Sequence, residues 1–139
     1  LDGYRIVLLE FPHSHVLVGA DQLVRWLLAR KIRPMIAHPE RNKEIMRDVD
    51  KLYPFVSMGC LLQVTAASLV GEFGPQSEKT ALDLLGRDWI DVVATDSHNL
   101  EHRPPILNRA REFLVDWGGD ALAARLTELT PARILGVEP

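Results

Sequence analysis

Two residues whose side chains can bind metals or protons, Asp96 and His98, follow an apolar run that predicts a buried strand. Residues 92–94 are valine, valine and alanine, which suit the interior of a parallel sheet. Alternate residues of an extended chain point the same way, so the carboxylate and the imidazole could converge on one point. Parallel α/β proteins keep their chemistry just past the ends of their strands. The pair is therefore a candidate functional site, although Asp-Ser also suits an ordinary turn or helix cap.

Other predicted strands end in residues of the same kind. The run 5–11 has Glu10 near its end, the run 34–37 leads directly into His38, and the run 60–65 ends in threonine. Imidazole favours transition metals, and carboxylate suits Mn and Mg, so the combined set predicts a metal site. Taken singly, each residue has a simpler explanation as a helix cap, an ion-pair partner or a hydrogen-bonding loop residue. The candidate ligands are Glu10, His38, Asp96 and His98.

Arginines follow two of these strand ends. Arg41 lies three residues after His38, and Arg103 lies five residues after His98. A guanidinium binds phosphate or carboxylate through two parallel hydrogen bonds, so both arginines are candidates for substrate binding. The alternative for each is an arginine in a solvated loop.

Two further patterns favour structural roles. His-Ser-His at 13–15 resembles a metal-binding His-x-His, but it falls in the loop after the first predicted strand. Cys60 opens an apolar strand, and the sixth residue after it is Ala66, where a cysteine phosphatase loop needs arginine. Cys60 is therefore predicted to be a thiol of the core.

Strand patterns alternate with helical patterns along the chain, which favours a parallel sheet or barrel with helices outside and one domain. The expected strands are 5–11, 34–37, 60–65 and 91–95. The expected helices are 21–30, 43–47, 49–58, 76–85, 104–117, 121–129 and 131–135, and 66–75 is expected to be a loop.

Bulk composition bounds the class of protein. The chain has 139 residues, 47% of them apolar and 25% charged, as in an ordinary globular domain. A net charge of −3 gives no reason to expect nucleic acid or an anionic membrane as a partner. The apolar runs are strand-sized, so no membrane insertion is expected. The single cysteine cannot form an internal disulfide, which favours a reducing cytoplasm.

Several sequence blocks together resemble the bacterial protein-tyrosine phosphatases of the PHP (polymerase and histidinol phosphatase) superfamily, which are typically encoded in capsule and exopolysaccharide operons. Ala-His-Pro-Glu-Arg-Asn at 37–42 and Thr-Asp-Ser-His-Asn at 95–99 are the most specific blocks. The others are Leu-Glu-Phe-Pro at 9–12, Leu-Gln-Val-Thr-Ala-Ala-Ser-Leu at 62–69 and Gly-x-Phe-Gly at 71–74. They occur in the family's order over nearly the whole chain.

The resemblance implies a distorted seven-stranded β/α barrel with a metal cluster at the carboxyl ends of its strands. In residues 1–139 it implies a single partial PHP domain with about four parallel strands and outer helices. Glu10, His38, Asp96 and His98 match metal ligands, with Mn expected first and Fe, Zn or Mg as alternatives. The family opens with a His-x-His strand and further acidic ligands that would precede Leu1, so the cluster is expected to be incomplete in this chain.

The implied activity is metal-dependent protein-tyrosine phosphatase, in which metal-activated hydroxide hydrolyses the phosphomonoester. Arg41 and Arg103 would hold the phosphate, and His98 or a water would supply the leaving-group proton. The implied partner is an autophosphorylated bacterial tyrosine kinase in capsule or exopolysaccharide regulation, with activity reduced by the incomplete cluster. The alternatives are a phosphoesterase for a small monoester such as histidinol phosphate, or a non-catalytic α/β domain.

An open, partial barrel also has a consequence for association. Its first strand would have an unpaired edge, and apolar residues such as Ile6, Leu8 and Val64 would be uncovered. Exposed edges and apolar patches favour pairing between chains, so homo-oligomerisation through this edge is expected.

Overall fold

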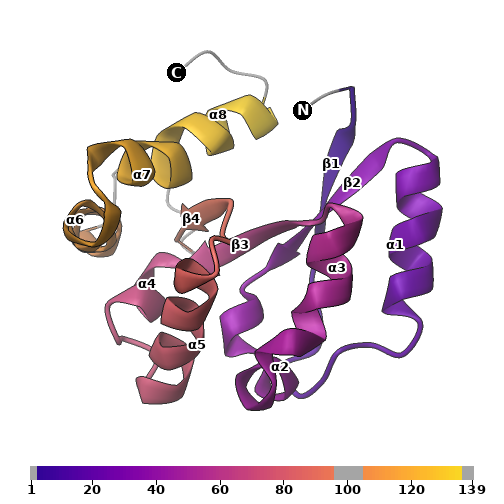
Figure 1. Ribbon diagram of the computed structural model, residues 1–139, viewed down its shortest axis with the longest axis horizontal. Helices are drawn as coiled ribbons and strands as arrows, with labels where there is room; N and C mark the ends of the chain where they lie inside the picture. The colour runs from indigo at the N-terminus through magenta and orange to yellow at the C-terminus, as the bar shows by residue number, and fades with distance from the viewer. Residues whose placement is uncertain (1–2, 96–104, 136–139) are drawn as a thin grey trace.

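Parallel strands form one sheet in the computed structural model, which describes residues 3–95 and 105–135. The strands are β1 (Arg5–Leu9), β2 (Ile32–Ala37), β3 (Leu61–Thr65) and β4 (Val92–Ala94). They lie in the order β1-β2-β3-β4, and each neighbouring pair is parallel (Figure 1). The predicted α/β class with four parallel strands is confirmed. Since the carboxyl ends of parallel strands lie at one edge, the residues that follow β1, β2 and β4 leave the sheet on the same side.

Helices connect the strands and close the chain. The α-helices are α1 (Ala20–Ala29), α2 (Lys43–Arg47), α3 (Tyr53–Met58), α4 (Ala66–Leu69), α5 (Pro75–Gly86), α6 (Pro105–Gly118), α7 (Asp120–Ala124) and α8 (Thr130–Leu135). Two short 3-10 helices are η1 (Pro39–Arg41) and η2 (Val49–Leu52), and η3 (Arg125–Leu129) is a π-helical segment between α7 and α8. α1 packs on the inner strand β2, whereas η3 packs on the edge strand β4. No helix among the described residues is long and apolar enough to cross a membrane.

β2 begins at Ile32, two residues before the predicted start. Two expected boundaries at the carboxyl edge of the sheet are also wrong. The predicted loop at 66–75 begins with helix α4, because Ala-Ala-Ser-Leu has good helix formers and three of these side chains are buried. The first strand ends at Leu9, so Glu10 lies beyond the strand and not in it. Both differences occur at the functional edge of the sheet, where each strand gives way to the residues that could do chemistry.

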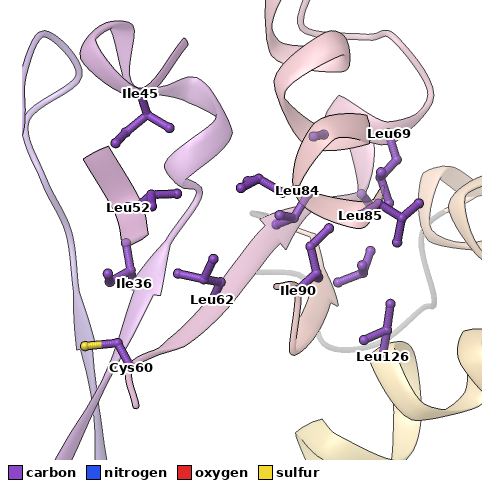
Figure 2. Packing of buried hydrophobic residues seen from close by; sticks show 14 of the residues in the cluster. Ile36, Ile45, Leu52, Cys60, Leu62, Leu69, Leu84, Leu85, Ile90 and Leu126 are labelled. Atoms are coloured by element: carbon purple, nitrogen blue, oxygen red, sulfur yellow. The ribbon is translucent and has the colours of Figure 1, made fainter. Parts of the chain in front are cut away.

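The hydrophobic core lies on the central strands. Ile36 and Leu62 are fully buried, and Figure 2 shows them next to each other with Leu52 close by. Val64 is also fully buried, so the expectation that it is uncovered is wrong: β3 has a strand on each side and helices against it. Leu8, in the edge strand β1, is 55% exposed, as expected.

Candidate active site

Glu10 and His38 meet at the carboxyl ends of β1 and β2. The His38 Nε2 atom lies 3.9 Å from Glu10 Oε1, with the imidazole 15% exposed and the carboxylate 62% exposed. This separation is too long for a hydrogen bond. It does not exceed the sum of two metal–ligand bonds of about 2.0–2.2 Å each. An imidazole and a carboxylate this close are a candidate pair of ligands for one divalent cation, and their role as ligands stays a prediction.

A strained turn brings His38 to this position. Its backbone is left-handed, with φ 37° and ψ 52°. This is unusual because the residue is not glycine and a proline follows it. Such a conformation costs roughly 1–2 kcal/mol for most residues, and a following proline restricts it further. The His38 N–H donates to the Gln63 carbonyl at 2.8 Å, which extends the pairing of β2 with β3 by one residue. The chain then turns off the sheet at Pro39, and the imidazole is left at its edge.

A second imidazole lies against the first. The rings of His13 and His38 are stacked, with centroids 5.7 Å apart and planes at 21°. His15 does not join them, because its Nδ1 is 2.7 Å from the Ser14 hydroxyl at an exposed position. Within residues 3–95 and 105–135 no group of three or more His, Cys, Asp or Glu side chains is placed to hold a metal. The remaining candidates, Asp96, His98 and Arg103, lie outside the described residues.

Asn42 holds the loop that carries His13. Its Oδ1 accepts hydrogen bonds from the N–H groups of Glu44 and Ile45, so it caps α2. Its Nδ2 donates to the carbonyls of Pro12 and His15 at 2.8 and 2.9 Å. The side chain is buried, and its amide makes all four of the hydrogen bonds it can form, two as donor and two as acceptor. One amide therefore fixes the loop after β1 against the helix after β2.

Glu40, which lies between His38 and Arg41 in the sequence, has a fully buried side chain. Its Oε2 accepts from the Thr65 N–H at 3.2 Å and from the Ser68 hydroxyl at 2.6 Å. Its Oε1 is buried and has no hydrogen-bond partner within the part of the chain that the structure describes. Burial raises the pKa of this carboxyl, and the hydrogen bonds offset part of that effect. Glu40 therefore ties η1 to the end of β3 and the start of α4.

Arg41 stacks on an aromatic ring at the border of a basic cleft. Its Cζ lies 3.9 Å from the centroid of Phe73, which is 41% exposed in the turn after α4. The stacking restrains the planar guanidinium, whose geometry suits a phosphate or carboxylate ligand. The cleft, of about 490 Å³, is lined by Arg41, Lys43, Arg47 and Lys79 among others.

Cys60 is buried and takes no part in this site. Burial raises the pKa of the thiol to about 11, which leaves almost no thiolate near neutral pH. The structure therefore agrees with the prediction of a core thiol.

Sequence analysis missed the roles of Glu40, Asn42 and Phe73. An asparagine directly before a helical run is a recognisable N-cap signal, so the cap at Asn42 could have been predicted. Its contacts with the loop after β1 had no local signal. Glu40 had none either, because an isolated charged residue is expected to be exposed.

Comparison with known proteins decides the family. The family model described as "Capsular polysaccharide synthesis, CpsB/CapC" matches residues 1–136. The chain belongs to the CpsB/CapC family.

Individual members of the CpsB/CapC family agree with this assignment. The chain is 38% identical over 128 residues to the tyrosine-protein phosphatase YwqE of Bacillus subtilis, covering 92% of this chain and 50% of YwqE. It is 31% identical over 144 residues to the tyrosine-protein phosphatase CpsB of Streptococcus pneumoniae, covering 97% of this chain and 58% of CpsB. The chain thus spans about half the length of these curated relatives.

A solved CpsB/CapC structure has the same fold. It comes from work on YwqE from Bacillus subtilis and CpsB from Streptococcus pneumoniae, described as unique metal-dependent tyrosine phosphatases. The TM-score is 0.85 with 36% sequence identity over 99% of this chain and 56% of the solved one. The resemblance inferred from the sequence blocks is therefore confirmed for family and fold.

Proposed function

We propose that this chain contributes to the active site of a metal-dependent protein-tyrosine phosphatase. The observation that supports this most directly is the meeting of Glu10 and His38 at the carboxyl edge of the sheet, with Arg41 three residues further along. The tyrosine phosphatases YwqE and CpsB, to which the chain is similar, favour this activity over hydrolysis of a small monoester and over a purely structural role. The substrate proposed is an autophosphorylated bacterial tyrosine kinase in cytoplasmic control of capsule or exopolysaccharide synthesis.

The residues divide into those that would hold metal and those that would hold phosphate. Glu10 and His38, together with Asp96 and His98, would hold a divalent cation, with Mn proposed first because the family resemblance implies it and carboxylates suit it. When bound, the metal supplies Lewis acidity and makes hydroxide available near neutral pH. The stacked guanidinium of Arg41, and that of Arg103, would bind the equatorial phosphate oxygens and offset the charge that develops on them.

The leaving group of a phosphotyrosine needs little assistance from a general acid. A tyrosine phenol has a pKa of about 10, so its anion leaves far more readily than an alkoxide. Proton donation to the phenolate oxygen by His98 or by solvent would then assist the reaction without being decisive. His13, stacked on His38, would act as a positioning residue for that imidazole.

The test compares an imidazole of the site with one outside it. Protein supplied with Mn²⁺ is assayed on p-nitrophenyl phosphate and on a phosphotyrosine peptide, with bound metal measured by elemental analysis. His38→Ala should lower both metal content and hydrolysis, the latter by about 100-fold, because loss of a hydrogen-bond partner of a metal ligand already costs about 10- to 100-fold and His38 is proposed as a ligand itself. His15→Ala, which removes an exposed imidazole of the neighbouring loop, should leave both unchanged. A protein that binds no Mn²⁺, or a folded His38→Ala with unchanged metal content, would refute the proposed part of this chain in the site.

A further inference from the structure

The basic cleft is lined by Arg41 of η1 and by residues of α2 and α5. These two α-helices pack together (Figure 1). Four of its lining side chains are cationic, and none is acidic. They are Arg41, Lys43, Arg47 and Lys79. The whole chain has a net charge of −3, so this concentration of positive charge is local and opposite to the average of the molecule. Such a cleft attracts anions more strongly than scattered surface charges do.

Three of the four cleft cations are outside the ion pairs that the structure shows. No ion pair found among the described residues includes Lys43, Arg47 or Lys79, and all three are exposed. Asp48 and Asp83 line a neighbouring pocket together with Arg47 and Lys79, and both accept hydrogen bonds from other groups, Asp48 from the Asp50 N–H and Asp83 from Arg87. Glu44 accepts the Val16 N–H, and Arg87 pairs with Asp83 and Asp50.

Arg41 joins this cleft to the candidate active site. It lines the cleft, and it also follows His38 by three residues in the turn held by Glu40. A phosphate bound at Arg41 would therefore lie at the mouth of the basic cleft. The rest of a peptide that carries that phosphate would continue past Lys43, Arg47 and Lys79.

The size and character of the cleft favour an extended chain over a single small anion. At about 490 Å³ it is much larger than one phosphate needs, and its cations are spread along two helices. An extended peptide advances by about 3.3 Å per residue, so successive acidic side chains could meet successive cations. Flexible exposed lysines suit such distributed contacts, whereas a site for one phosphate uses convergent, fixed donors.

We infer that the cleft between α2 and α5 binds acidic side chains that flank the phosphotyrosine of a peptide substrate. This inference rests on the proposed function, because it takes the phosphotyrosine to be held at Arg41. It specifies the substrate further, as a phosphotyrosine segment rich in aspartate or glutamate on one side.

The inference is tested by binding, independently of catalysis. Two fluorescent peptides carry the same non-hydrolysable phosphotyrosine mimic, difluorophosphonomethyl-phenylalanine, flanked by glutamates in one and by glutamines in the other. Fluorescence anisotropy should show tighter binding of the glutamate peptide, by roughly two- to fivefold per charge contact, as for exposed ion pairs. The preference should shrink as salt rises, because the screening length falls to about 8 Å at 0.15 M.

Variants that remove single positive charges show which residues cause the preference for the glutamate peptide. Arg47→Gln and Lys79→Gln should each bring the affinity ratio of the two peptides closer to one, roughly two- to fivefold per variant. Lys51→Gln removes one positive charge from an exposed residue of η2 that does not line the cleft, and it should leave the ratio unchanged.

The outcomes separate this inference from the proposed function. Equal affinity for the two peptides, or an equal shift of the ratio in Lys51→Gln, would overturn the role of the cleft whether or not the protein is a phosphatase. Hydrolysis of p-nitrophenyl phosphate by the unmodified protein, measured in parallel, judges only the proposed function, because that substrate has no flanking residues.

Discussion

The Glu40 carboxylate accepts a hydrogen bond from the Ser68 hydroxyl at 2.6 Å, which joins the turn after β2 to the helix after β3. Both residues are fully buried. The turn also contains His38 and Arg41, so this one contact sets the position of a candidate metal ligand and of a candidate phosphate ligand together. A buried carboxyl with a raised pKa beside the site makes the stability of this turn depend on pH.

Replacing Glu40 should remove that pH dependence. The folded state binds a proton at Glu40 more tightly than the unfolded state does, because burial raises the pKa. The stabilising contribution is therefore full below the ordinary glutamate pKa of 4.5 and is lost as pH rises through the raised value. Urea unfolding should show that Glu40→Gln is less sensitive to pH between 4.5 and 7.5 than the unmodified protein. Burial also raises the pKa of Asp91, so the free energy of unfolding of Glu40→Gln should still change somewhat with pH.

An exposed glutamate provides the control for this experiment. Glu72 is exposed and pairs with Arg109, so Glu72→Gln should keep the pH dependence of the unmodified protein. If the free energy of unfolding changes with pH equally in Glu40→Gln and Glu72→Gln, Glu40 is not the cause of the pH dependence.

His38→Asn should separate folding from metal binding. Asparagine tolerates the left-handed backbone that His38 adopts, so the free energy of unfolding should stay within about 1 kcal/mol of the original. Mn²⁺ binding, followed by titration calorimetry, should weaken about 10-fold or more because the imidazole is gone. A β-branched replacement, His38→Val, should destabilise the protein further, since such residues tolerate positive φ poorly. Unchanged Mn²⁺ affinity in His38→Asn would exclude His38 as a ligand.

Asn42→Ala should be among the more destabilising single substitutions at this edge. It removes a helix cap worth about 1 kcal/mol, and it leaves the carbonyls of Pro12 and His15 without their donor, so a total of about 2–4 kcal/mol is expected. Urea unfolding measures the change. Asp48→Ala removes the exposed cap of η2, which has one hydrogen bond, and should cost only about 0.5–1 kcal/mol. Equal costs would show that the contacts with the loop contribute nothing.

Cys60 should react slowly with thiol reagents. Its pKa of about 11 and its burial both suppress the thiolate that iodoacetamide attacks, so alkylation at pH 7.5 should be about 100-fold slower than in urea. Cys60→Ala should retain whatever hydrolysis of p-nitrophenyl phosphate the unmodified protein shows. Loss of that hydrolysis in a folded variant would indicate a cysteine mechanism.

The edge of β1 should promote association of this chain. Among the described strands β1 pairs only with β2, and Val7 and Leu8 are 37% and 55% exposed. Light scattering across micromolar concentrations should show a rising apparent mass, because an open apolar edge pairs readily with another chain. Leu8→Lys should shift the mass toward that of the monomer, whereas Lys31→Gln, at the exposed turn before β2, should not. A concentration-independent monomer would contradict this expectation.

Patterns along the chain predicted the alternation of strands and helices, the polar residues at the strand ends and, through the ordered blocks, the family. These properties are local: apolar periodicity and the switch from apolar to polar residues are present in the chain before it folds. Glu10, His38 and Arg41 were identifiable in this way. Asp96, His98 and Arg103 were identified by the same means and lie outside the described residues.

How these residues are held became visible in the folded structure. The contact of Glu40 with Ser68, the stacking of His13 on His38 and the cleft between α2 and α5 each join segments that are distant in sequence. No local pattern predicts such pairings, and the burial of Glu40 opposes the usual preference of a charged side chain for water. The residues that could perform chemistry were recognisable one at a time, whereas their support and the basic surface beside them depend on packing of the whole sheet and its helices.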